Sequence, residues 1–426
     1  MNLFEINGGK PLRGRVTPAG NKNAALPMIA AALLTDEEVI LENVPNIGDV
    51  RTMLALAEAV GAEVSWDPAA HHLRLRAANL HNPVLPDKLC ADIRASILFA
   101  APLLHRLWRA EMAPPGGDVI GRRRLDAHFQ GLQALGASID ANAGYHFRAP
   151  QRLMGADIFL PEASVTATEQ LVMAAVLANG RTVLRNAASE PHVQDLCLLL
   201  VKMGAVIEGI GSNTLTIDGV EKLGGAFHRI LADHTEVGSF LAMAAATGGE
   251  ITVTDADPAH YIMVSRAFAR LGIQLRFHNG EVHLDAEQPR EVVPEFGGGI
   301  PVLDDGPWPH FPSDLMSVMI VLATQVRGPA LFFEKMYESR MYFVDRLIAM
   351  GANAVICDPH RVVVSGPARL HAMDISSPDI RAGTALVAAA LCARGTSTIR
   401  NVHLIDRGYE GIEAKLAALG ADITRK

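Results

Sequence analysis

Val60-Gly61-Ala62 closes a helix-like run of this chain, and five later runs close on a tag of the same kind. The later tags are Leu135-Gly136-Ala137, Met203-Gly204-Ala205, Leu271-Gly272-Ile273, Met350-Gly351-Ala352 and Leu419-Gly420-Ala421. The steps from one tag glycine to the next are 75, 68, 68, 79 and 69 residues. Self-similarity at a nearly fixed period indicates a repeated structural unit. The sequence therefore predicts six units of about seventy residues each.

Each unit also contains an earlier stretch that is apolar nearly all round, which is typical of a helix buried on every side. These stretches span residues 24–34, 94–105, 167–177, 237–247, 315–324 and 382–392. Short β-branched runs such as Thr182-Val183-Leu184 predict strands around them. The helix before each tag is amphipathic instead, and the tag glycine suits the C′ position just beyond its end. The predicted fold class is α/β, with strands interleaved with one buried and one half-exposed helix in each unit.

The six units divide naturally into two domains of three, because a single core is unlikely in a chain of 426 residues. We expect a first domain over residues 22–231 and a second over residues 232–426. The leading residues 1–21 are expected to return and pair with the second domain. Two domains of this size can bury their own cores, so the expected oligomeric state is a monomer.

Composition excludes several classes of partner. The chain has 38 Lys and Arg against 46 Asp and Glu, a formal net charge of −8, which argues against a nucleic-acid or membrane surface as partner. The four cysteines show no CxxC spacing, which favours a reduced setting with buried thiols. The sequence has no apolar run of the roughly eighteen residues that a membrane span needs and no signal peptide. We therefore expect a soluble, cytoplasmic protein.

Polar residues interrupt the apolar template at the start of each buried helix. They are Lys22-Asn23, Arg94, Ser164, Thr235-Glu236, Ser313-Asp314 and Asp379 with Arg381. Helix N-termini present free N–H groups and a positive dipole end, so together they favour an anion. Ser164, Ser313 and Asp379 also suit plain N-caps. A cation at a helix start opposes the dipole, so Lys22, Arg94 and Arg381 indicate an anionic ligand.

Three further arginines precede the tag glycines at comparable distances. Arg123, Arg340 and Arg407 stand 13, 11 and 13 residues before their tags. Arginine grips phosphate and carboxylate with two parallel hydrogen bonds, although any one of these could be a solvated surface residue. Repeat symmetry places all three with the cationic helix starts, which predicts one basic cluster in an acidic protein.

Two carboxylates stand in this setting. Asp314 begins a buried helix, where it could act as a general base toward a substrate hydroxyl. The neighbouring Asp304 and Asp305 compete for that role, and the internal alignment favours Asp314. Asp118 lies in a loop rich in proline and glycine, from Pro114 to Gly121, which favours a mobile lid. Turn formation is the alternative role for Asp118.

The chain resembles the enolpyruvyl transferases over essentially its whole length. The motifs that carry the resemblance are Gly20-Asn21-Lys22-Asn23-Ala24-Ala25-Leu26-Pro27, Arg94-Ala95-Ser96-Ile97, Pro115-Gly116-Gly117 with Ile120-Gly121, Phe311-Pro312-Ser313-Asp314, Arg381-Ala382 and Ile405-Asp406-Arg407-Gly408-Tyr409-Glu410. The likeness is closest to members that act on UDP-N-acetylglucosamine at the first committed step of peptidoglycan synthesis. It is weaker to the 5-enolpyruvylshikimate-3-phosphate synthases. The resemblance implies two inside-out α/β-barrel domains of three units each, with the active site in the cleft between them.

The resemblance also implies roles for individual residues. Lys22, Arg123 and Arg407 would hold phosphoenolpyruvate, Arg340 and Arg381 would lie near its carboxylate, and Arg94 would help to close the lid. The uridine diphosphate would be held by Arg123, Arg124, Leu125, Asp126, Ser164, Val165 and the neighbourhood of Met336. Asn23 and Asp314 would bind the sugar, and Asp314 would take the proton from its 3-hydroxyl. The scheme needs no metal and no organic cofactor, because the arginines stabilise the charge.

Departures from the family pattern change some of these expectations. Asp118 stands where many members carry cysteine, so donating a proton near neutral pH requires a protonated carboxyl, which desolvation or a nearby anion favours. A carboxylate is a poorer soft nucleophile than a thiolate. We therefore predict insensitivity to fosfomycin, an epoxide that alkylates the family's cysteine.

Three further departures concern the acceptor. Arg124, Thr166 and Ser189 replace the usual Pro, Gly and Arg near the predicted nucleotide-sugar residues. Two alternatives therefore stay open: an enolpyruvyl transferase with another nucleotide acceptor such as UMP, and a non-catalytic paralogue that binds nucleotide sugars. Retention of a base and an anion clamp argues against the second alternative.

Overall fold

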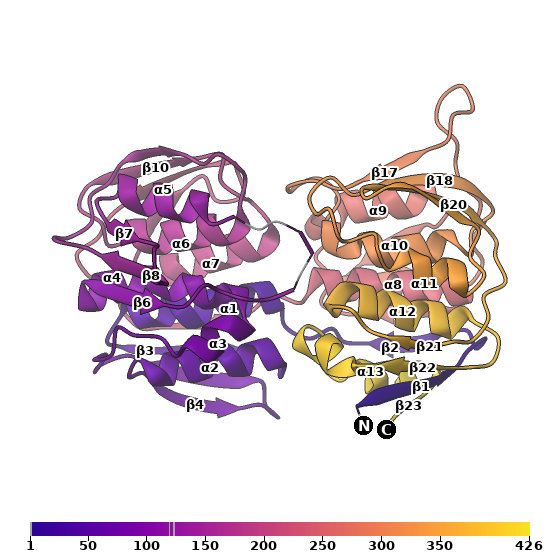
Figure 1. Cartoon of the computed structure of the whole chain (residues 1–426), viewed down its shortest axis with the longest axis horizontal. Coiled ribbons are helices and arrows are strands. Elements are labelled where there is room, and N and C mark those ends of the chain that lie inside the picture. The colour runs from indigo at the N-terminus through magenta and orange to yellow at the C-terminus, as the bar shows by residue number, and fades with distance from the viewer. Residues whose placement is uncertain (1, 119, 122–123) are drawn as a thin grey trace. The chain divides into compact units, whose positions relative to one another are not determined.

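The computed structural model describes residues 2–118, 120–121 and 124–426, and it divides into two compact units (Figure 1). The 20–231 unit contains Gly20–Gly117 and residues 124–231. The 232–426 unit contains Ala232–Lys426, residues 2–19 and the described part of the 118–122 segment. The chain thus passes from one unit to the other after Ala19 and after Leu231, and residues such as Asp118 belong to the 232–426 unit.

The six repeats share one plan with local variations, and the plan is clearest in the third repeat. Its elements are β9 (Asp157–Phe159), α6 (Val165–Ala175), β10 (Arg181–Arg185), α7 (Pro191–Lys202), β11 (Val206–Glu208) and β12 (Thr214–Asp218). They form a four-stranded sheet in the order β9-β10-β12-β11, in which β9 is parallel to β10 and the other pairs are antiparallel. The third repeat therefore combines a buried helix, an amphipathic helix and a small mixed sheet.

The other two repeats of the 20–231 unit follow this plan. The first contains α1 (Lys22–Ala31), η1 (Ala32–Leu34), β3 (Glu38–Glu42), α2 (Gly48–Ala59), β4 (Glu63–Asp67) and β5 (His72–Arg76), and its edge strand is β13 (Ala226–Arg229). The second contains α3 (Asp87–Asp92), η2 (Arg94–Phe99), α4 (Ala100–Leu107), β6 (Arg109–Met112), α5 (Asp126–Ala134), β7 (Ser138–Asp140) and β8 (Tyr145–Arg148). In the second, a single parallel bridge between Val84 and Glu111 stands in place of the edge strand.

The 232–426 unit repeats the plan three more times. The fourth repeat contains α8 (His234–Thr247), β14 (Glu250–Val253), η3 (Pro258–His260), α9 (Ile262–Arg270), β15 (Leu275–His278) and β16 (Glu281–Leu284). The fifth contains β17 (Val302–Asp304), η4 (Ser313–Leu315), α10 (Met316–Ala323), β18 (Gly328–Phe333), α11 (Val344–Ala349), β19 (Ala354–Asp358) and β20 (Arg361–Gly366). The sixth contains β21 (Asp374–Ser376), α12 (Ile380–Cys392), β22 (Thr396–Arg400), η5 (Val402–Arg407), α13 (Ile412–Ala418) and β23 (Asp422–Arg425).

The N-terminal segment completes two sheets of the 232–426 unit. β1 (Leu3–Asn7) lies between β22 and β23 and is antiparallel to both. β2 (Arg13–Val16) is the parallel edge strand beside β14. The first residues of the chain therefore supply strands that the fourth and sixth repeats lack.

The apolar stretches are buried helices, which confirms their predicted role. In the 232–426 unit α8, α10 and α12 pack against one another, and Figure 1 shows α10 and α12 between β18 and β22. In the 20–231 unit α6 packs against both α1 and α4. Alanine is frequent in these helices, and small side chains let helix axes approach closely. Each unit has its own hydrophobic core cluster.

The six tags are helix C-caps of one kind. Their glycines all have positive φ, from 69° at Gly272 to 107° at Gly61. In the first repeat the N–H of Ala62 donates to the carbonyl of Ala57, and that of Gly61 donates to Glu58. This is the Schellman pattern, which glycine permits because it carries no Cβ. The same two bonds recur at the other five tags.

Within the described residues the strands form six separate small sheets, and no closed barrel is detected. One expectation needs correction. Cys357 is exposed, Cys392 is half-buried, and Cys90 and Cys197 are buried, so the thiols are not uniformly interior. A further finding is that no described helix has the length and hydropathy of a membrane span.

Candidate functional site

Asp314 is held by two arginines of its own unit. Nη2 of Arg340 donates to Oδ1 at 3.1 Å, and Nη2 of Arg381 donates to Oδ2 at 2.7 Å. The arginine side chains are only 4 % and 8 % exposed, whereas that of Asp314 is 30 % exposed. Each carboxylate oxygen thus has a charged donor, and one side of the group stays open to solvent. The structure brings these three predicted residues together.

Helix starts position this cluster. Asp314 lies in η4, directly before α10, and Arg381 is the second residue of α12. Asp379 caps α12 by accepting from the main-chain N–H groups of Arg381 and Ala382, both at 2.8 Å. Burial raises the pKa of Asp379, while these two N–H groups oppose that shift. Asp379 is therefore an N-cap, one of the two roles that its position predicted.

The start of α8 completes the cluster through His234, a residue that the sequence analysis missed. Burial lowers the pKa of His234 to about 4, so the imidazole is neutral at pH 7. Asp314 and Arg381 both act on it electrostatically, and its ring meets that of Trp308 edge to face at 6.4 Å. The N-termini of the three buried helices of this unit, α8, α10 and α12, therefore lie together at the Asp314 cluster. The signal that could have found His234 is its position beside Asp233, which caps α8.

Asp118 forms an ion pair with Arg407 inside the same unit. Nη1 of Arg407 donates to Oδ1 of Asp118 at 2.6 Å, and the side chains are 21 % and 19 % exposed. Arg407 ends η5. A carboxylate paired in this way accepts hydrogen bonds, so proton donation from Asp118 requires the contact to open or the carboxyl to gain a proton.

The loop around Asp118 is fixed by close backbone contacts. The N–H of Gly116 donates to the carbonyl of Cys90 at 3.0 Å, and a Cβ on Gly116 would lie 1.6 Å from the carbonyl oxygen of Ala91. Beyond Asp118, the carbonyl of Ile120 accepts from the N–H of Ser339 at 3.1 Å. The described part of the predicted lid is thus hydrogen-bonded to other parts of the chain.

In the 20–231 unit, Lys22 opens α1 and pairs with Asp49 of α2. The distance from Nζ to Oδ2 is 2.8 Å, and the side chains are 12 % and 5 % exposed. Asn21 caps the helix by accepting from the N–H of Ala24 at 2.9 Å, and Asn23 is half-buried beside it. A buried carboxylate therefore balances the cation at this helix start. The sequence analysis missed Asp49, because the pairing depends on how α1 and α2 pack.

The predicted nucleotide-binding residues other than Met336 belong to the 20–231 unit. Nη2 of Arg94 donates to the carbonyl of Arg124 at 3.0 Å, which fixes the chain just before α5. Arg124 and Asp126 are exposed, and Leu125 is 7 % exposed. Arg123 lies outside the described residues.

Ser164 and Val165 stand at the start of α6. Ser164 is its N-cap and accepts from the N–H of Ala167 at 3.4 Å. Two residues on, Oγ1 of Thr166 lies 3.0 Å from Nε2 of His128, whose Nδ1 lies 2.6 Å from Oε1 of Gln170. Burial lowers the pKa of His128 to about 4. The Thr166 hydroxyl thus supplies a partner for a neutral buried histidine.

Ser313 and Met336 lie near Asp314. The hydroxyl of Ser313 donates to Glu334 and makes no side-chain cap, so one of the two predicted roles for Ser313 was wrong. Met336 is 38 % exposed, and its N–H also donates to Glu334, at 3.1 Å.

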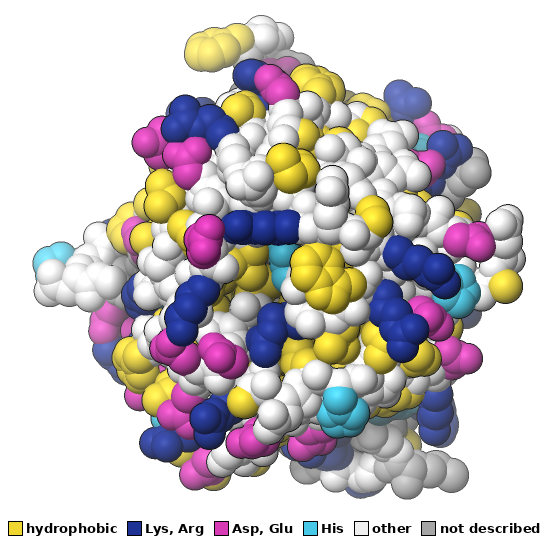
Figure 2. Space-filling model, turned by 90° about the vertical axis from the view of Figure 1, so that its left-hand side faces the viewer, with side chains coloured by type: hydrophobic (Ala, Val, Ile, Leu, Met, Phe, Trp, Pro, Cys, Tyr) yellow, Lys and Arg dark blue, Asp and Glu magenta, His cyan; other side chains and the backbone are white. Residues whose placement is uncertain are grey.

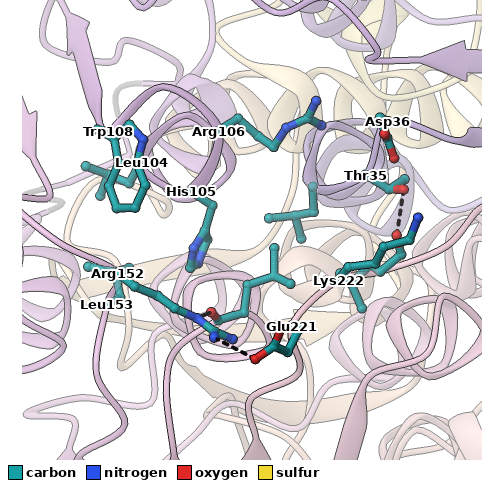
Figure 3. Close-up of a pocket in the computed structure, with 13 residues that line it drawn as sticks. Thr35, Asp36, Leu104, His105, Arg106, Trp108, Arg152, Leu153, Glu221 and Lys222 are labelled. Atoms are coloured by element: carbon teal, nitrogen blue, oxygen red, sulfur yellow. Dashed lines mark hydrogen bonds and ion pairs between the residues drawn. The ribbon is translucent and has the colours of Figure 1, made fainter.

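A separate pocket of about 330 Å³ lies at the C-terminal ends of the buried helices of the 20–231 unit (Figure 3). Figure 2 shows one face of this unit, where Lys and Arg side chains surround a hydrophobic centre. Arg106 donates to the carbonyls of Leu33 and Ala77 at 3.0 and 2.8 Å. Arg152 donates to Leu177 at 2.9 Å. These arginines satisfy main-chain carbonyls at the ends of helices and beyond β5, which is a structural role, and the pocket contains none of the predicted site residues.

The donor set of the site favours anions. Within the described part of the chain, no group of three or more His, Cys, Asp or Glu side chains is placed to hold a metal ion. The cluster instead offers guanidinium groups, which bind carboxylate and phosphate.

Comparisons with known proteins agree with this reading. The model of the family described as EPSP synthase (3-phosphoshikimate 1-carboxyvinyltransferase) matches residues 6–416. Relatives named UDP-N-acetylglucosamine 1-carboxyvinyltransferase match at full length. That of Bradyrhizobium diazoefficiens is 53 % identical over 99 % of this chain and 97 % of its own. Those of Borreliella burgdorferi and Treponema pallidum are each 51 % identical over 100 % of this chain and 99 % and 100 % of their own.

Solved structures show the same fold. The enolpyruvyl transferase NikO from Streptomyces tendae has a TM-score of 0.87 at 24 % identity and covers 100 % of this chain and 99 % of its own. EPSP synthase from Acinetobacter baumannii has a TM-score of 0.75 at 17 % identity and covers 100 % of both chains. The chain therefore belongs to the EPSP synthase family of enolpyruvyl transferases and, within it, to the group of UDP-N-acetylglucosamine 1-carboxyvinyltransferases.

Proposed function

We propose that this chain transfers the enolpyruvyl group of phosphoenolpyruvate to the 3-hydroxyl of UDP-N-acetylglucosamine and releases phosphate. The observation that carries the proposal is full-length identity of 51 to 53 % with relatives named for this reaction. The Asp314 cluster supports it chemically, because the reaction needs a base for a hydroxyl and cations for an anionic donor.

Asp314 is the proposed general base. Its carboxylate accepts from Arg340 and Arg381, and its exposed side can reach a sugar hydroxyl. The 3-hydroxyl proton passes to Asp314 as the oxygen bonds to C2 of phosphoenolpyruvate, and the methylene carbon C3 gains a proton. The intermediate then loses that C3 proton and its phosphate, which gives the enolpyruvyl ether.

The arginines and Lys22 are the proposed binding groups for phosphoenolpyruvate. Nη1 of Arg381 is buried and has no hydrogen-bond partner among the described residues. A buried donor without an acceptor is costly, so an incoming carboxylate or phosphate oxygen would satisfy it. Arg340, Arg407 and Lys22 are held by carboxylates, so an anion of higher charge can compete for them.

Asp118 is the proposed proton donor to the methylene carbon. Its ion pair with Arg407 places the carboxyl beside a group that we also assign to phosphoenolpyruvate. When the ligand's anionic groups take over Arg407, Asp118 loses its counter-ion, and protonation becomes easier. Insensitivity to fosfomycin follows from the same residue, because a carboxylate is a weak soft nucleophile.

We assign the nucleotide to Arg123, Arg124, Leu125, Asp126, Ser164, Val165 and Met336, the sugar to Asn23 with Asp314, and lid closure to Arg94. The 24 % identity with NikO supports the fold alone, so we propose no second acceptor.

The test is phosphate release from phosphoenolpyruvate, with mass spectrometry of the nucleotide product. We expect release that depends on UDP-N-acetylglucosamine, with a product heavier by one enolpyruvyl group. UMP and shikimate 3-phosphate serve as control acceptors. Release with a control acceptor and silence with UDP-N-acetylglucosamine would reject the proposal.

A further inference from the structure

Glu334 is a fully buried carboxyl directly behind the Asp314 cluster. It is 0 % exposed, and both its oxygens accept from the hydroxyl of Ser313, at 3.0 and 2.8 Å. Its Oε1 also accepts from the main-chain N–H groups of Met336 and Tyr337, both at 3.1 Å. Glu334 therefore ties the helix start that carries Asp314 to the segment that leads to Arg340.

A second buried carboxyl lies beside it. Asp305 is 0 % exposed, and its Oδ1 accepts from the N–H of Lys335 at 2.5 Å. Burial above all, and then a side-chain hydrogen bond with Asp305, raise the pKa of Glu334 to about 8. Two adjacent buried carboxyls resist double ionisation, which favours the protonated form of Glu334.

Arg340 is the cation that faces this pair. Its Nε lies 3.6 Å from Oε2 of Glu334, while its Nη2 binds Asp314. Further titratable neighbours are His360, whose Nδ1 contacts the main-chain carbonyl of Glu334 at 2.7 Å, Lys335, which follows Glu334 in the chain, and Tyr337, whose ring lies 5.0 Å from the Arg340 guanidinium. The charge on Glu334 therefore acts first on Arg340, and through Arg340 on Asp314.

We propose that Glu334 is a positioning residue for the reaction proposed above, and that it acts as a neutral carboxyl that shares its proton with Asp305. In this form it anchors Ser313, and hence Asp314, and it leaves the positive charge of Arg340 to Asp314 and to an anionic substrate. Loss of the proton places a second carboxylate against Arg340. This weakens the interaction of Arg340 with Asp314 and with the substrate.

The first arm of the test is the pH dependence of kcat/KM for phosphoenolpyruvate between pH 6 and 9.5. We expect the wild type to lose about tenfold across pH 8, and Glu334→Gln to lack this step because its amide does not titrate. Titration of the substrates is common to both proteins and cancels in their ratio. Glu58→Gln, an exposed change in α2, is the matched control and should keep the wild-type profile. A step that persists in Glu334→Gln would overturn the proposal.

The second arm needs no activity. An acid with a folded pKa near 8 and an unfolded value near 4.5 holds a proton in the folded state that the unfolded state has released. The wild type should therefore lose stability as pH rises from about 5 to 8, with a contribution of about 3 °C in Tm per pH unit from this group. The Tm of Glu334→Gln relative to wild type should rise over that range. Parallel Tm curves would contradict a proton on Glu334.

The two arms separate this inference from the proposed function. No turnover with a diverging pair of Tm curves would reject the proposed function and leave the proton on Glu334 established. Asp305→Asn covers the case in which Glu334→Gln fails to fold. It removes a group that raises the pKa of Glu334, so the alkaline step should move to lower pH. An unmoved step in Asp305→Asn would overturn the inference.

Discussion

Replacing Asp314 with asparagine separates its chemical role from its structural one. Asparagine keeps one oxygen acceptor for Arg340 or Arg381 and removes the negative charge between them. Breaking a fully buried ion pair costs about 3 to 5 kcal/mol, but Asp314 is 30 % exposed and water can solvate the released donors. We therefore expect a loss of about 2 kcal/mol, or about 4 to 8 °C in the Tm of a unit of this size. Loss of the general base should lower kcat by about 10² to 10⁴.

The assay combines turnover with binding of phosphoenolpyruvate. Asp314→Asn removes a negative charge from an anion site, so phosphoenolpyruvate affinity should be kept or increased while kcat falls. An unfolded variant would lose both. Asp304→Asn is the matched control: Asp304 is also 30 % exposed, belongs to the same unit and pairs with Lys335. An Asp314→Asn enzyme with more than a tenth of the wild-type kcat would refute the assignment of the base.

Three further predictions concern single residues. Wild-type activity should survive preincubation with fosfomycin, whereas Asp118→Cys should lose activity with time and gain a covalent adduct by mass spectrometry, because Arg407 stabilises a thiolate there. The pKa of His128 is lowered to about 4 by burial, so below pH 6.5 the unfolded state binds a proton that the folded state does not. Wild-type stability should fall by about 2 kcal/mol between pH 6.5 and 5 from this residue, and urea titrations of His128→Gln should lack that component. Gly116→Ala should cost about 2 kcal/mol in urea denaturation because its methyl group meets the carbonyl of Ala91, and Gly299→Ala, with 3.8 Å of clearance, is the control.

The repeated fold was predictable because its signal is local and recurs six times. The positive φ of a Schellman cap requires a glycine such as Gly61. The run before β3 is apolar on all sides, which is typical of a helix buried on every side. The strand pairings that complete the sheets were predictable only in part. Pairing of the N-terminal segment with the second half follows from its lack of a partner nearby, but the single bridge at Val84 leaves no sequence signal.

The cationic residues and the carboxylates Asp118 and Asp314 were singled out from the sequence, but their pairings and the partners Asp49 and Glu334 were not. Lys22 stands out because a cation opposes the helix dipole at that position, whereas its partner Asp49 reads as an ordinary first-turn acid of α2. Glu334 was hidden for a similar reason, since a glutamate at the end of β18 carries no sign that it will be buried. Such pairings arise from how distant segments pack, which periodicity and capping rules do not encode.

The ion pairs explain how an acidic chain keeps an anion site ready. Lys22, Arg340, Arg381 and Arg407 each pair with a carboxylate of the same unit. Buried guanidinium groups need counter-charges to be stable, and these carboxylates also fix their orientation. Each contact is a single carboxylate with one formal charge, whereas phosphoenolpyruvate carries a phosphate and a carboxylate together. On the proposed function, the substrate would outcompete the internal partners without reorganising the arginines, and the displaced carboxylates of Asp118 and Asp314 would become available for proton transfer in the same event.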